Sequence, residues 1–223
     1  MLEGEDNNLY WKSLTDKENL IKLHIGCGLC LKEDYINIDS ETKDEILKRY
    51  QGSDNIIFKN YQEQNIEIFN YDIFNLPFID NSVDEILCSA FLEHLDFIEE
   101  RKFFYEVKRI LKKGGLFKFS VPDFEWIVKK WIGAKENWKD FWYTDKGEYW
   151  FGHGDRNMNS RWGYLTAAIF GNQGSRGQYH KNAFTRKKIE KILDHLDFEI
   201  IDFNTTYYRG KFEKTLNYSS KKL

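Results

Sequence analysis

The sequence predicts an α/β fold built around a largely parallel sheet. Short β-rich runs alternate with stretches whose apolar residues recur at helical spacing. The first run ends in a glycine corner, Gly26-Cys27-Gly28, and the next ends on Asp39. Because parallel strands bring their carboxyl ends to one edge of the sheet, where such folds bind ligands, the sequence predicts the place of a site as well as a fold.

Five strands are expected in the first part of the chain, each an apolar run between polar or turn residues: 20–25, 35–38, 66–71, 83–89 and 116–121. A helix is expected over 44–50. Ten residues separate Gly28 from Asp39, which are too few for a full helix and its turns. We therefore expect 28–34 to be a loop.

A well-marked helix begins at Asp96, where Glu99 three positions later suggests a capping box. Its inward face carries Phe103, Val107, Ile110 and Leu111, and it is expected to end at Lys112-Lys113-Gly114.

Thr185 is a suitable N-cap for a further helix, which is followed by a strand over 198–203. The tail 209–223 is polar and basic, and we expect it to complete an antiparallel hairpin at the sheet edge.

The composition indicates one domain with one core, since 223 residues suit a single α/β unit spanning 1–223 with an insertion at 122–183. A net charge of −3 gives no broad attraction to nucleic acid. The acidic N-terminus lacks the features of a secretory signal, and no apolar run reaches the ~20 residues that span a bilayer. We expect a cytoplasmic protein with no membrane contact.

Three cysteines, Cys27, Cys30 and Cys88, suit a reducing compartment. Cys27 and Cys30 have the spacing of a redox motif or of half a zinc site, but no second cysteine pair completes such a site. The carboxylates Glu93, Asp123 and Asp155 form no convincing ligand pattern with the histidines. We expect no metal.

Three strand ends carry residues that suit an adenosine moiety laid along the sheet edge. The glycine corner would take the amino-acid part of a cofactor, Asp39 the ribose diol and Asp72 the adenine amine, while Ile73 would pack on the ring. Each feature alone has an ordinary explanation as a turn, a helix cap or a loop carboxylate. Their joint occurrence favours a nucleoside site.

The chain resembles the class I S-adenosylmethionine-dependent methyltransferases over residues 20–122. The motifs are Leu23-His-Ile-Gly-Cys-Gly28, Tyr35-Ile-Asn-Ile-Asp39, the run from Tyr71 to Asp84, Phe91-Leu-Glu-His-Leu95 and Glu106-Val-Lys-Arg-Ile-Leu-Lys-Lys-Gly-Gly115. The resemblance implies a Rossmann-like, seven-stranded, mostly parallel sheet with its last strand reversed. It also implies S-adenosylmethionine as cofactor, S-adenosylhomocysteine as product, and a methyl group directed toward 88–91. The cofactor-binding residues would be Gly26, Cys27, Gly28, Asp39, Asp72, Ile73 and Ser89.

The usual third glycine and first helix of the family are missing. In this the chain looks like a subgroup of small bacterial methyltransferases often associated with polysaccharide and other glycoconjugate pathways. Val121-Pro-Asp-Phe124 and His180-Lys-Asn-Ala-Phe184 extend that resemblance.

The insertion at 122–183 is interpreted as an aromatic-rich lid for substrate recognition. Six of the seven tryptophans fall between 126 and 162, where they either form the core of the lid or stack on a sugar or nucleobase. Arg156 and Arg176 could grip an anionic acceptor or belong to solvated turns, and Tyr179 could orient the acceptor.

Three histidines are candidates for a general base, because an imidazole titrates near neutrality: His94, His153 and His180. His94 lies nearest the methyl group in the family layout, although a structural hydrogen-bonding role is equally compatible with its position.

The leading hypothesis is methyl transfer to an oxygen, or with less support a nitrogen, of a small polar acceptor such as a sugar or nucleotide sugar. The protein would act as a monomer or homodimer. An aminopropyl transferase on the same fold and a non-catalytic nucleoside-binding scaffold stay open as alternatives. A nicotinamide dehydrogenase is disfavoured by the missing third glycine.

Overall fold

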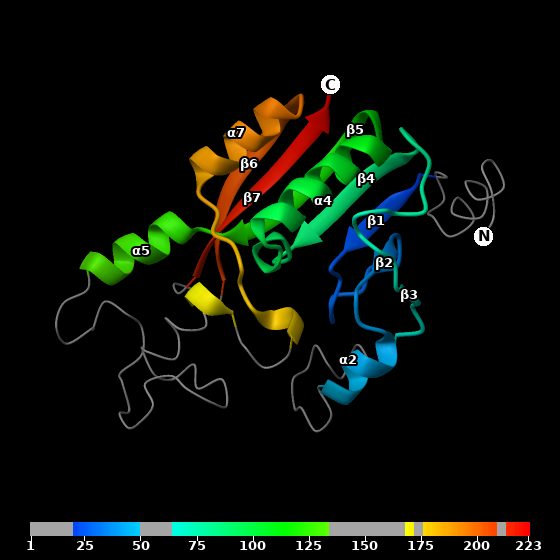
Figure 1. Ribbon diagram of the computed structural model, residues 1–223, viewed down its shortest axis with the longest axis horizontal. Helices are drawn as coiled ribbons and strands as arrows, with labels where there is room; N and C mark the ends of the chain where they lie inside the picture. The colour runs from blue at the N-terminus through cyan, green and yellow to red at the C-terminus, as the bar shows by residue number, and fades with distance from the viewer. Residues whose placement is uncertain (1–19, 50–63, 134–167, 172–175, 209–212) are drawn as a thin grey trace.

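The computed structural model describes residues 20–49, 64–133, 168–171, 176–208 and 213–223. Its sheet has seven strands in the order β3-β2-β1-β4-β5-β7-β6 (Figure 1). The strands are β1 (Lys22–Ile25), β2 (Ile36–Ile38), β3 (Ile68–Phe69), β4 (Val83–Ser89), β5 (Leu111–Pro122), β6 (Phe198–Tyr208) and β7 (Glu213–Lys222). The helices are α2 (Lys43–Arg49), α4 (Phe97–Ile110), α5 (Phe124–Gly133) and α7 (Arg186–His195), with the short 3-10 helices η1 (Leu92–His94) and η3 (Arg176–Gln178).

The first five strands pair in parallel, and β7 runs antiparallel to both β5 and β6. This arrangement confirms the predicted α/β class and the reversed last strand. The expected strands and helices are all present, although β3 is shorter than expected and β5 and β6 are longer, and 28–34 contains no helix, as expected. No helix in the described part of the chain combines the length and the apolar character that crossing a membrane requires.

The C-terminal tail completes an antiparallel hairpin that ends the sheet, which confirms the prediction, and the structure adds the order of its two strands. In this hairpin β7 lies between β5 and β6, and β6 is the edge strand. Alternate residues of β7 explain this place, because Leu216, Tyr218 and Ser220 are buried in a pattern of period two. Tyr218 stacks on Phe119 of β5 with ring centroids 5.3 Å apart.

Helix α4 begins as its sequence predicts. Asp96 Oδ1 accepts hydrogen bonds from the N–H groups of Ile98 and Glu99, and the Glu99 carboxylate accepts one from the Asp96 N–H at 2.8 Å. The helix ends at Ile110, earlier than expected. Residues 112–114 belong to β5 instead, because Leu111 already has an extended backbone and is buried in the core.

The core joins α4 to the sheet through aromatic side chains. Phe103 and Phe104 of α4 and Phe117 and Phe119 of β5 are buried, and the Phe104 ring meets Phe117 edge-on at 5.8 Å. Figure 1 shows α4 and α7 over the same face of the sheet. Each such buried ring contributes about 1.5–3 kcal/mol through the hydrophobic effect.

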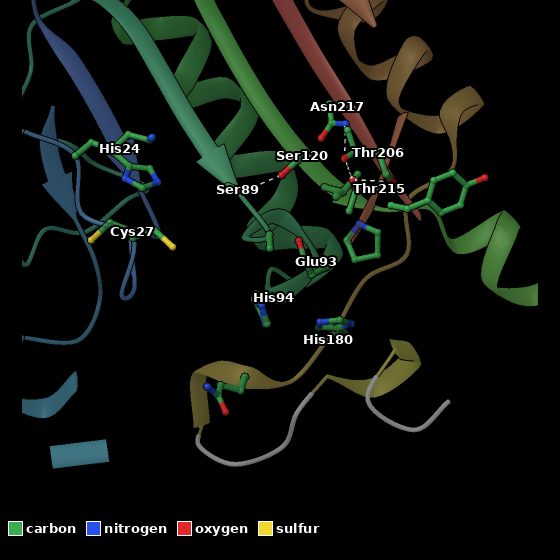
Figure 2. Close-up of a pocket in the computed structure, with 18 residues that line it drawn as sticks. His24, Cys27, Ser89, Glu93, His94, Ser120, His180, Thr206, Thr215 and Asn217 are labelled. Carbon is green, nitrogen blue, oxygen red and sulfur yellow. Dashed lines mark hydrogen bonds between the residues drawn. The ribbon is translucent and has the colours of Figure 1, made fainter. Parts of the chain in front are cut away.

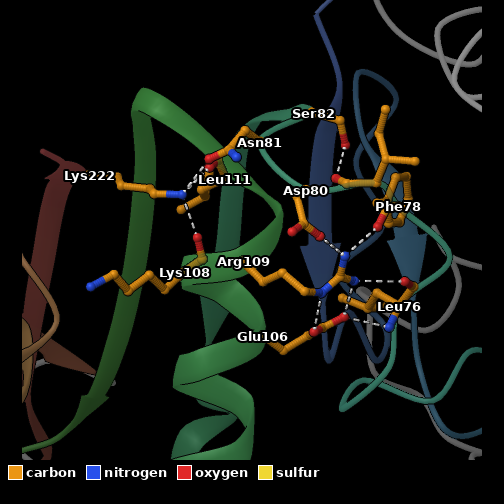
Figure 3. Close-up of polar contacts among 11 residues, drawn as sticks. Leu76, Phe78, Asp80, Asn81, Ser82, Glu106, Lys108, Arg109, Leu111 and Lys222 are labelled. Carbon is orange, nitrogen blue, oxygen red and sulfur yellow. Dashed lines mark hydrogen bonds and ion pairs between the residues drawn. The ribbon is translucent and has the colours of Figure 1, made fainter.

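Arg109 fastens α4 to the segment that follows β3 (Figure 3). Its guanidinium pairs with Glu106 at 2.6 Å and Asp80 at 2.7 Å, and donates to the carbonyls of Leu76 and Phe78. Glu106 also accepts a hydrogen bond from the Leu76 N–H at 2.7 Å. The network holds the segment between β3 and β4, which includes Asp72.

The insertion is described only in part. Helix α5 was not predicted; Asp123 accepts a hydrogen bond from the Trp126 N–H in its first turn, and Ile127 is buried. Residues 134–167 and 172–175 lie outside the described residues, as do His153 and Arg156. The lid assignment therefore stays a prediction, and so does the division of the chain into one domain with an insertion.

Candidate functional site

The glycine corner connects β1 to the predicted loop. Gly26 and Gly28 have φ angles of +68° and +48°, in the left-handed region that side chains disfavour. A Cβ on Gly26 would lie 2.3 Å from Cδ2 of Phe91, whereas a Cβ on Gly28 would meet nothing within 4 Å. Gly26 is therefore required for packing, and Gly28 leaves open space beside the backbone.

Asp39 closes this corner from the end of β2. Its Oδ2 accepts a hydrogen bond from the Gly28 N–H at 2.8 Å, and its Oδ1 accepts one from the Glu41 N–H at 3.0 Å. The side chain is half-buried, and each carboxylate oxygen has a second lone pair that a ligand hydroxyl can use. The structure thus brings Asp39 to the glycine corner, as the sequence predicts.

Asp72 follows β3, which pairs with β2, so it lies on the same edge of the sheet. Its side chain is exposed and accepts a hydrogen bond from the Phe74 N–H at 3.0 Å. Ile73 is half-buried against the core. The adenine-binding role of these two residues stays a prediction.

A cavity of about 760 Å³ opens beside the glycine corner. Gly26 and Cys27 line it on one side, Ser89 and Ala90 follow at the end of β4, and Ser120 lines it from β5. Figure 2 shows this hollow with Thr206, Thr215 and Asn217 on the opposite side from His24 and Cys27. The volume is that of a site for a small organic ligand. Neither Asp39 nor Asp72 is among the residues that line it.

His94 and His180 line the same cavity and are close to each other, with ring centroids 5.0 Å apart. Nδ1 of His94 lies 3.0 Å from the Tyr179 carbonyl, and Nδ1 of His180 lies 3.2 Å from the Ala168 carbonyl. Each contact favours the tautomer that carries its proton on Nδ1 and the lone pair on Nε2.

Burial keeps both rings neutral at neutral pH. Loss of water lowers the pKa of His180 to about 4, with a further contribution from His94. The same effect lowers the pKa of His94, although the carbonyl of Tyr179 opposes it. The two histidines are therefore hydrogen-bonded and uncharged, and the structure brings two of the three predicted bases together.

Glu93 completes this group. Its side chain is buried and lines the cavity beside the histidines, and one ligand atom from each of Glu93, His94 and His180 lies within 4.8 Å of the other two. From the sequence Glu93 was considered with the histidines, but His180 could not be placed beside it, because His180 lies far along the chain. Asp123, which was considered with Glu93, instead pairs with Lys214 at 3.3 Å.

The structure gives less information about the remaining predicted residues. The Tyr179 side chain is exposed, and it is the main-chain carbonyl of this residue, not its hydroxyl, that contacts His94. Arg176 begins η3. Burial raises the pKa of the Cys27 and Cys88 thiols, which keeps them protonated and unsuited to thiolate chemistry.

Sequence reasoning missed several lining residues. His24 of β1 is buried, with Nδ1 3.3 Å from Oδ1 of Asn37, and burial lowers its pKa to about 4. Thr206, Thr215 and Asn217 are linked by hydrogen bonds across β6 and β7. The spacing of these polar residues along β6 and β7 places them on one face of the sheet. It could have indicated a shared wall only if the position of β7 had been known.

The strand order, the reversed β7 and the glycine corner at the end of β1 define a class I S-adenosylmethionine-dependent methyltransferase fold. In agreement, residues 23–119 match the family model of a methyltransferase domain. The chain is also similar to an uncharacterized protein of Methanocaldococcus jannaschii, with 29% identity over 132 residues that cover 57% of this chain. It spans about half the length of that relative, of which 52% is covered.

Solved structures share the fold. A methyltransferase of Methanosarcina mazei has a TM-score of 0.55 at 16% identity, covering 100% of this chain and 99% of its own. One of Clostridium acetobutylicum has a TM-score of 0.51 at 19% identity, covering 96% and 92%. The 1,6-didemethyltoxoflavin-N1-methyltransferase of Burkholderia thailandensis, solved with 1,6-didemethyltoxoflavin and S-adenosylhomocysteine, has a TM-score of 0.51 at 11% identity, covering 98% and 77%.

Proposed function

We propose that this protein transfers a methyl group from S-adenosylmethionine to an oxygen of a small polar acceptor held in the cavity. The observation that carries the proposal is the continuity of one cavity from Gly26 at the glycine corner to Thr206 and Asn217 at the far wall. A donor seated on the corner and an acceptor on the wall would share this space, which is what in-line transfer requires.

The residues present fit the cofactor. Gly28 leaves open space beside the backbone, Asp39 offers carboxylate oxygens next to it, and Asp72 lies on the same edge. When bound, S-adenosylmethionine supplies an electrophilic methyl group on a good leaving group. The protein then has to align the acceptor and exclude water, and alignment alone removes a large part of such a barrier.

The wall of the cavity favours a hydroxyl-rich acceptor. Ser120, Thr206, Thr215 and Asn217 line it with neutral donors and acceptors, which match the hydroxyl groups of a sugar. Lys32 lines the same cavity and would pair with a phosphate, so a nucleotide sugar is the preferred form of the acceptor. A neutral imidazole of His94 or His180 would take the proton of the acceptor hydroxyl as a general base.

The aminopropyl alternative is less well supported. A polyamine acceptor carries several positive charges, whereas Glu93 is the only carboxylate among the described residues that line the cavity. The sequence-based expectations of a cytoplasmic protein, of no nucleic acid partner and of a monomer or homodimer stay part of the proposal.

The experiment that tests the proposal combines calorimetry with turnover. Titration with S-adenosylhomocysteine should show binding, and labelled S-adenosylmethionine should transfer its methyl group to one member of a panel of sugars and nucleotide sugars. Cofactor binding without turnover across the panel would favour the scaffold alternative. Transfer of an aminopropyl group from the decarboxylated cofactor would replace the proposal, and absence of any binding would end it.

A further inference from the structure

We propose that Glu93, His94 and His180 form a binding site for a divalent transition metal of the zinc type at the acceptor end of the cavity. One carboxylate and two imidazoles are a common ligand set for catalytic zinc. The three ligand atoms lie within 4.8 Å of one another. Ligands around a tetrahedral zinc ion lie about 3.3 Å apart, given bonds of about 2.0–2.1 Å, so small side-chain rotations would close the site.

The two segments that carry the ligands are clamped together by main-chain hydrogen bonds. The Glu93 carbonyl accepts hydrogen bonds from the N–H groups of Lys181 at 2.8 Å and Asn182 at 3.2 Å. His94 Nδ1 contacts the Tyr179 carbonyl on the same segment. The backbone therefore holds η1 against the residues around His180 before any ion binds, which reduces the cost of assembling the site.

The histidines also have the outer contacts that metal ligands commonly have. A zinc-bound imidazole usually donates its second N–H to a carboxylate or a main-chain carbonyl, which fixes the tautomer and the ring orientation. His94 and His180 each place Nδ1 against a main-chain carbonyl, at 3.0 Å and 3.2 Å, and so keep the Nε2 lone pair for an ion.

Glu93 is 3% exposed and lies beside the two imidazole rings at the wall of the cavity. Figure 2 shows Glu93, His94 and His180 at the same hollow, so an ion there would be reached from the cavity.

The chemical consequence rests on the proposed function. Three protein ligands leave a fourth position of the ion open to the cavity, where the acceptor hydroxyl would coordinate. Coordination lowers the pKa of such a hydroxyl, as zinc lowers that of water from 15.7 to about 7. With both Nε2 lone pairs on the ion, neither histidine acts as the base, so the acceptor O–H bond breaks and its proton passes to water. The oxygen then bonds to the methyl carbon as the carbon–sulfur bond breaks, and that electron pair stays on the departing thioether sulfur.

Metal binding is tested without reference to turnover. Protein dialysed against a chelator should bind one equivalent of Zn²⁺ in calorimetry, and Co²⁺ in its place should give the visible absorption bands of a four-coordinate ion. Glu93→Gln and His180→Ala should each weaken Zn²⁺ binding by at least about tenfold. Cys30→Ser and the exposed His195→Ala are matched controls that should leave binding unchanged.

Two further measurements distinguish failure of the metal site from failure of the proposed function. S-adenosylhomocysteine binding by the same variants shows that they fold and separates the two kinds of failure. Anomalous scattering from zinc-soaked crystals should place the ion between the three side chains. Failure of the unaltered protein to bind Zn²⁺, equal binding by the variants, or an anomalous peak at Cys27 and Cys30 would overturn the inference.

Discussion

The carboxylate of Asp39 accepts a hydrogen bond from the main-chain N–H of Gly28 at 2.8 Å, and this contact joins the end of β2 to the turn that leaves β1. The same side chain is half-buried, so it both shapes the corner and lies at the place where a ribose diol would bind. The corner and its carboxylate are therefore one unit, and a change to either should affect cofactor binding.

Replacing Asp39 with alanine should weaken S-adenosylhomocysteine binding by about 1–3 kcal/mol, since it removes a charged hydrogen-bond acceptor. Calorimetry at fixed ionic strength measures this change. The exposed Asp44→Ala on α2 serves as the control for loss of one negative charge and should bind as the unaltered protein does. Equal affinity for Asp39→Ala and the unaltered protein would contradict the assigned role.

The two glycines of the corner should respond differently to alanine. In Gly26→Ala the new methyl group would lie 2.3 Å from the Phe91 ring, so the free energy of unfolding should fall by several times the roughly 1 kcal/mol that backbone strain alone costs. Gly28→Ala meets no neighbour within 4 Å and should lose only that strain energy. Urea denaturation of both variants measures which one loses more free energy of unfolding. A smaller loss for Gly26→Ala than for Gly28→Ala would show that the corner is packed differently.

Arg109→Met should destabilise the fold by about 1–3 kcal/mol, because charged hydrogen bonds to Glu106 and to two main-chain carbonyls are lost together. The guanidinium is about one-third exposed, which limits the effect. Lys129→Met, which breaks an exposed pair with Glu125 on α5, is the control and should cost much less than Arg109→Met. Equal losses in chemical denaturation would argue against the bracing role of Arg109.

Stability should fall in mild acid because of His24. Burial lowers its pKa from 6.5 to about 4; the Asn37 contact opposes this shift, Lys32 adds to it and Asp39 opposes it. Between these two pH values the unfolded chain binds more protons than the folded one, so the free energy of unfolding decreases as the pH falls, by up to about 3 kcal/mol for this group. His24→Gln should flatten this part of the stability curve. Parallel curves for the two proteins would rule out the contribution.

Local sequence patterns predicted most of the fold. The capping box at Asp96 and the N-cap at Thr185 each act within one helical turn, and both appear in the structure. The glycine corner and Asp39 could be predicted for a similar reason, since they follow consecutive strands that pair in parallel.

Long-range pairing could not be predicted in the same way. The residues of β7 alternate between buried and half-buried, but nothing local to the tail shows that β7 enters the sheet between β5 and β6. The grouping of Glu93 with His180 likewise depends on main-chain hydrogen bonds between segments far apart in sequence. Both features contribute residues to the wall of the cavity, and both therefore needed coordinates.

A crystal structure with S-adenosylhomocysteine bound tests the central claim most directly. The account predicts that the ribose hydroxyls bind Asp39, that the amino-acid part lies over Gly26 and Gly28, and that the sulfur faces the cavity lined by His94 and His180. A ligand seated away from the glycine corner, or a sulfur directed away from that cavity, would contradict it.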